Sequence, residues 1–133
     1  MTTPRPWYDA LAKPSWTPAP STIGAVWAVI YPLIAVAAAT TAFKVWKGDA
    51  SPWVLLPLAL NLAANAAFTP ILFGRHDLVL ATADILVVLV TIALWMAFLW
   101  RPGSMWVVLV LAPYLAWVST ATVLQVSITL ANH

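Results

Sequence analysis

Long apolar stretches separated by short polar segments form the main pattern along the chain. They run roughly over residues 21–43, 52–73, 78–100 and 104–130. Each is long enough to cross a bilayer as a helix, which takes about 20 residues. The connecting segments are short, so each helix should run antiparallel to the next. The pattern predicts an all-α membrane protein, a single domain over residues 1–133 built as a bundle of four transmembrane helices.

Composition excludes a soluble domain. Hydrophobic residues make up 63% of the 133 positions and charged residues only 8%, whereas a soluble domain carries roughly 25% charged residues. Cysteine is absent, which excludes disulfides and thiolate chemistry. The net charge of +2 is too small to indicate a nucleic-acid partner. Basic residues divide three against three between the two sides of the predicted bundle, so charge does not predict its orientation.

The segment before the first span, residues 1–20, is rich in tryptophan and proline. Between Trp7 and Pro18 it contains Tyr8, Lys13 and Trp16 but no apolar run long enough to cross a membrane. Aromatic side chains of this kind favour the membrane–water interface. We expect an interfacial N-terminal arm.

Two asparagines lie within the second span, at a spacing that places them on one helix face. Asn61 and Asn65 are four residues apart. Amides inside a bilayer usually hydrogen-bond across helices, so one interpretation is structural. The other is a polar contact within a ligand cavity. The sequence leaves both open.

Tryptophan is in excess, with nine in the chain. Most lie at span ends, where an aromatic belt accounts for them. Trp27 and Trp117 do not, because they lie about 9 Å and about 20 Å into their spans. Tyr114, Trp117 and Ala121 share a helix face just after Pro113. This face is suited to a flat ligand.

Recognisable catalytic chemistry is sparse. Asp84 is the only ionisable side chain well inside a span, and such residues are often functional. One carboxylate without a neighbouring acid or histidine does not support acid–base catalysis. His76 and His133 lack the spacing of metal ligands. We therefore predict no catalytic residues, no metal site and no required cofactor.

The ordered motifs resemble those of the TspO/MBR family. The family pattern WYxxLxKPxWxPP is matched by Trp7, Tyr8, Leu11, Lys13, Pro14, Trp16 and Pro18, with Ala19 in place of the last proline. Gly24, Trp27 and Tyr31 match the start of the next helix. Residues 65–74 resemble NxxWSPxFFG, with Phe68 replacing tryptophan, and residues 113–125 resemble PYLAWVSFATYLN.

This resemblance implies a bundle, often dimeric, whose pocket binds porphyrins. The candidate ligand-binding residues are Tyr8, Trp27, Tyr31, Asn61, Asn65, Phe68, Tyr114, Trp117 and Ala121. The ligand implied is a protoporphyrin or heme-type tetrapyrrole, and the location is a prokaryotic cell membrane. Some family members are associated with light-dependent porphyrin breakdown, which leaves an enzymatic role open. Sterol binding is not expected, because no aromatic–basic motif follows Trp117.

The family's first helix has no counterpart before Trp7 in this sequence. A second hypothesis follows: the protein is an accessory subunit of a larger membrane complex. Under it, a partner helix, a second copy, a lipid or a carotenoid takes the place of that helix. The expected partners are thus membrane lipids, an apolar small molecule, and another copy or another membrane protein.

Overall fold

The computed structural model describes residues 11–17 and 20–132, and all its regular elements are helical. They are α2 (Pro20–Trp46), η1 (Pro52–Val54), α3 (Leu55–Thr69), η2 (Pro70–Gly74), α4 (Leu78–Phe98) and α5 (Met105–Ala131). Four segments are apolar and long enough to span a membrane, which confirms the predicted fold class.

Span boundaries differ from the sequence prediction by up to three residues, and the second span is not one regular helix. It is a 3-10 turn, an α-helix and a π-helical turn in succession. Proline lacks the backbone N–H of a regular helix, and Pro52 and Pro70 begin the two irregular turns. The first span starts at Pro20, so Ser21 lies inside the helix.

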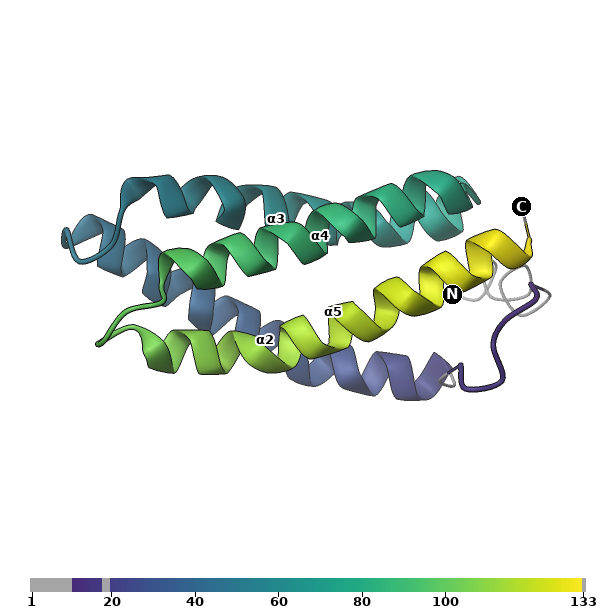
Figure 1. The fold of residues 1–133 in the computed structure, drawn as a ribbon, viewed down its shortest axis with the longest axis horizontal. Helices are drawn as coiled ribbons and strands as arrows, with labels where there is room; N and C mark the ends of the chain where they lie inside the picture. Colours follow the sequence, from purple (N-terminus) through teal and green to yellow (C-terminus); the bar gives the residue numbers. More distant parts are fainter. Residues whose placement is uncertain (1–10, 18–19, 133) are drawn as a thin grey trace.

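The helices form an antiparallel bundle in which α4 and α5 are central (Figure 1). Helix α3 packs on α4, α4 on α5, and α5 on α2. Helices α2 and α3 follow each other in the chain but are not among the closely packed pairs. The spatial order is therefore α3, α4, α5, α2, and it sets which side chains can meet.

The core lies where these helices meet. Ala37 of α2 has no exposed surface, which lets α2 approach closely. Trp95 of α4 is also fully buried, and its indole N–H donates to the Thr41 hydroxyl of α2 over 3.0 Å. This bond satisfies a polar group that lipid could not.

The N-terminal arm, so far as it is described, is held against the end of α5. The Asn132 side chain accepts from the Ala12 N–H over 3.0 Å and donates to the Ala12 carbonyl over 2.9 Å. Leu11 packs against the buried pair Leu124 and Ile128. Residues 11–17 therefore run from the end of α5 towards the start of α2 (Figure 1).

Candidate functional site

A cluster of aromatic rings joins α2 to α5, with Trp27 at its centre. The Trp27 ring stacks on Tyr31 at a centroid distance of 5.1 Å. It meets Tyr114 and Trp117 edge-on, each at 6.4 Å. Edge-to-face contacts at such distances are favourable beyond the area they bury. The structure thus brings together four of the aromatic residues expected at a ligand site.

Both asparagines of α3 belong to a hydrogen-bond network behind this cluster. Tyr114 donates to the Asn61 side-chain oxygen over 2.9 Å and accepts from the Asn65 amide over 2.8 Å. The Asn61 amide also donates to the Val88 carbonyl and to the Thr91 hydroxyl. Asn61 has no exposed surface. The network ties α3 to both α4 and α5, as the structural interpretation of the pair expects.

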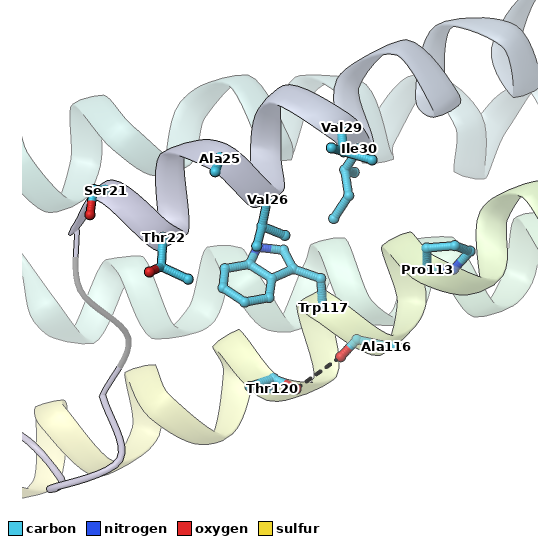
Figure 2. Close-up of a pocket in the computed structure, with 10 residues that line it drawn as sticks. All are labelled: Ser21, Thr22, Ala25, Val26, Val29, Ile30, Pro113, Ala116, Trp117 and Thr120. Carbon is cyan, nitrogen blue, oxygen red and sulfur yellow. Dashed lines mark hydrogen bonds between the residues drawn. The ribbon is translucent and has the colours of Figure 1, made fainter.

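An open groove lies between α2 and α5, with a volume of about 820 Å³. That is within the roughly 300–1,000 Å³ of small-molecule sites. Figure 2 shows its two walls, which are formed by Ser21, Thr22, Ala25, Val26, Val29, Ile30, Pro113, Ala116, Trp117 and Thr120. Hydroxyl groups gather near the start of α2, and the rest of the groove is apolar.

Trp117 connects this groove to the aromatic cluster. It lines the groove and also packs edge-on against Trp27. In Figure 2 its ring extends from α5 across towards Val26 of α2. Its indole N–H is buried and finds no acceptor among the residues that the structure describes. A buried N–H of this kind ordinarily has a partner.

Other predicted site residues lie elsewhere. Phe68 and Ala121 are half-buried and pack against the main core. Neither they nor Trp27, Tyr31, Asn61, Asn65 or Tyr114 line the α2–α5 groove. Tyr8 is outside the described residues. Whether these residues contact a ligand stays a prediction.

Most of the groove's lining was not singled out from the sequence. On α2 it includes Thr22, Ala25, Val26 and Val29, and on α5 Pro113, Ala116, Trp117 and Thr120. Both sets have the same i, i+3, i+4, i+7 spacing, which marks one helix face. Each face has one alanine and one threonine among larger residues. That repeated pattern is the signal that could have found the groove.

Asp84 remains an unusual feature of α4. One oxygen of its carboxylate is buried without a hydrogen-bond partner in the described part of the chain. Asp84 does not line the groove.

Comparison with known proteins decides the family. The model of the TspO/MBR family matches residues 1–131. The chain belongs to the TspO/MBR family. It is 39% identical over 130 residues to a tryptophan-rich protein TspO of Bacillus cereus, covering 96% of this chain and 82% of that protein.

The chain is also similar to proteins of a mammal and of a second bacterium. The human translocator protein is 33% identical over 132 residues, covering 96% of this chain and 75% of the human protein. A tryptophan-rich sensory protein of Cereibacter sphaeroides is 32% identical over 119 residues, covering 90% and 72%. With four membrane-length helices and these relatives, the chain is an integral membrane protein, and its bacterial relatives support a bacterial cell membrane as its location.

Proposed function

We propose that this TspO/MBR protein is a membrane receptor or carrier that binds a flat, apolar tetrapyrrole such as protoporphyrin IX in the α2–α5 groove. The observation that carries the proposal is Trp117: it lines the groove, and its buried N–H has no acceptor among residues 11–17 and 20–132. A tetrapyrrole ring offers both a flat face for the indole and nitrogen or carboxylate acceptors for the N–H.

The polarity of the groove suits such a ligand. Val26, Val29 and Ile30 offer an apolar wall along about one turn of α2. Ser21 and Thr22 stand at the start of that helix, with Thr120 opposite. A protoporphyrin has an apolar ring with carboxylates along one edge. The ring would lie on the apolar wall, with the carboxylates towards the hydroxyl groups.

The aromatic cluster gives the site its rigidity in this proposal. Trp27 packs edge-on against the Trp117 ring, and Tyr31 and Tyr114 in turn pack against Trp27. Aromatic side chains locked by such packing lose little entropy when a ligand binds. The proposal concerns binding and includes no chemical turnover.

Titration of the purified protein with protoporphyrin IX tests the proposal, with porphyrin absorbance and tryptophan fluorescence as the two signals. Trp117→Phe replaces the two fused rings of the indole with a single ring and removes the N–H. It should weaken protoporphyrin IX binding at least tenfold. Trp27→Phe should weaken it less, because Trp27 supports Trp117 from behind. Trp106→Phe is the control, because Trp106 is 48% exposed and does not line the groove. Equal affinities for Trp117→Phe and Trp106→Phe would refute the proposed site.

A second candidate function is that of an accessory subunit in a larger membrane complex. Its support is the spatial order of the helices: α2 and α3 are not closely packed against each other. We propose that a second copy or another membrane protein's helix lies along that side. Purification in mild detergent tests this, with the oligomeric mass and any co-purifying chain or pigment as readouts. A monomer without either would contradict it.

A further inference from the structure

Three cations lie together at one end of the bundle, opposite the turn between α3 and α4. Two turns of the chain meet at that end, one over residues 47–51 between α2 and α3 and one over residues 99–104 between α4 and α5 (Figure 1). The cations are Lys44, Lys47 and Arg101. They come from segments far apart in the sequence, so the fold, and not a local run of charge, brings them together.

Two of these cations reach from one turn to the other. The Lys44 ammonium donates to the Gly103 carbonyl over 3.3 Å, and the Arg101 guanidinium donates to the Asp49 carbonyl over 3.4 Å. Both distances are longer than the usual 2.7–3.2 Å of such bonds. The bonds therefore place the two charges where the turns meet, and they leave most of each cation's donor capacity to a stronger acceptor.

The protein does not neutralise this charge itself. Within residues 11–17 and 20–132, neither Lys44, Lys47 nor Arg101 forms an ion pair. Asp49 is the only acidic residue in the two turns, and it meets Arg101 through its backbone carbonyl. Lys47 lies 5.6 Å from the centroid of the Phe43 ring, near the outer limit of a cation–π contact. An anion from outside the chain can thus approach all three cations.

Exposed tryptophans fix the depth of these cations in the membrane. Trp46 directly precedes Lys47 and is 81% exposed, and Trp100 directly precedes Arg101 and is 67% exposed. An indole favours the level of the lipid headgroups, with its ring towards the acyl chains and its N–H towards the polar region. The neighbouring cations then lie at the level of the lipid phosphates. At the opposite end, Trp16 is the only tryptophan among the described residues outside the helices.

We propose that the cationic end, formed by Lys44, Lys47 and Arg101 with Trp46 and Trp100 beside them, binds the headgroup phosphate of an anionic phospholipid. The Arg101 guanidinium can hold two phosphate oxygens at once, and the lysines add charge. The two indoles lie against the glycerol and the upper acyl chains. A zwitterionic lipid binds more weakly, because its own ammonium opposes the three cations.

The cationic end is separate from the α2–α5 groove. Lys44 is about 21 Å further along α2 than Ile30, the last residue of that helix to line the groove. Neither Lys47 nor Arg101 lines it. The lipid site therefore does not depend on the proposed function, and its failure would leave that proposal untouched.

Native mass spectrometry of the protein in detergent, titrated with phosphatidylglycerol or phosphatidylcholine, measures the preference. The unmodified protein should bind phosphatidylglycerol more tightly. Lys44→Gln, Lys47→Gln and Arg101→Gln should each weaken phosphatidylglycerol binding about fivefold and leave phosphatidylcholine binding unchanged. Arg75→Gln is the matched control, because it removes one exposed cation at the opposite end of the bundle. Equal losses in Arg75→Gln and Arg101→Gln, or no preference in the unmodified protein, would overturn the proposal.

A second measurement needs no variant. Added phosphatidylglycerol should raise the unfolding temperature of the unmodified protein in detergent, because a lipid that binds the folded state stabilises it. This rise should shrink between about 0.1 M and about 1 M salt, where the screening length falls from about 10 Å to about 3 Å. Glycerol 3-phosphate, which carries the phosphate without acyl chains, should not reproduce it. A rise that is independent of salt, or an equal rise with glycerol 3-phosphate, would contradict a site for a lipid headgroup.

Discussion

Replacing Tyr114 with phenylalanine probes the polar network that joins α3 to α5. The substitution keeps the ring, and with it the edge-on contact to Trp27. It removes one hydroxyl that donates to Asn61 and accepts from Asn65. The Asn61 oxygen then becomes an acceptor with no donor at a position with no exposed surface.

The size of the effect follows from what each partner loses. A buried polar group left without a partner costs about 1–3 kcal/mol, whereas an interhelical hydrogen bond in a membrane protein contributes about 0.6 kcal/mol on average and at most about 1.7. Asn61 keeps its two donations to α4, so its orientation cannot relax freely. We expect Tyr114→Phe to lower the free energy of unfolding by about 1–2 kcal/mol.

Reversible unfolding in detergent, with circular dichroism as the signal, measures this loss. Tyr31→Phe is the control, because Tyr31 is 52% exposed and keeps its stacking on Trp27 as phenylalanine. It should change stability by less than about 0.5 kcal/mol. In the double variant Tyr114→Phe with Asn61→Leu, the loss should be smaller than the sum of the single losses. Strict additivity, or a loss for Tyr114→Phe equal to that for Tyr31→Phe, would refute the reasoning.

Two further predictions concern the contacts that hold α2 in place. Thr41→Val removes the acceptor of the fully buried Trp95 indole N–H. It should lower the free energy of unfolding by about 1–2 kcal/mol in the same assay. An unchanged free energy of unfolding would mean that this hydrogen bond is not formed. Ala37→Leu places a large side chain where α2 has no exposed surface and should cost about 1–3 kcal/mol. Ala39→Leu, on the exposed side of the same helix, should leave the free energy of unfolding nearly unchanged. Equal losses for Ala37→Leu and Ala39→Leu would contradict the close packing of α2 at Ala37.

The membrane spans could be predicted from the sequence because hydropathy is a property of each segment by itself. The predicted boundaries and helix type were less accurate where a proline changes the backbone hydrogen bonding. The second span looked like one helix from residue 52 to 73, yet Pro70 begins a π-helical turn that continues to Gly74. Hydropathy does not register a change in backbone hydrogen bonding of this kind, because every residue involved is still apolar enough for lipid.

The candidate site depended on which helices meet, and the linkers do not specify this. Short connections suggested that consecutive helices are neighbours, but α2 packs on α5 rather than on α3. Trp27 and Trp117 were recognised because their depth in the membrane is unusual for tryptophan. The groove residues Ala25 and Ala116 were not, because an alanine on an apolar helix is unremarkable until its partner helix is known. The contact of Asn132 with the arm could not be predicted either, because its side chain bonds to backbone atoms of Ala12, which no side-chain pattern reveals.

Filling the groove from one wall is the most direct test of the central claim that it binds a tetrapyrrole. Ala116→Phe adds a ring inside the groove, while Ala93→Phe adds the same ring on an exposed face of α4. Equilibrium binding of protoporphyrin IX to the protein in lipid nanodiscs compares the two. The account predicts at least tenfold weaker binding for Ala116→Phe, unchanged binding for Ala93→Phe, and similar unfolding transitions for both. Unchanged affinity in Ala116→Phe would contradict it.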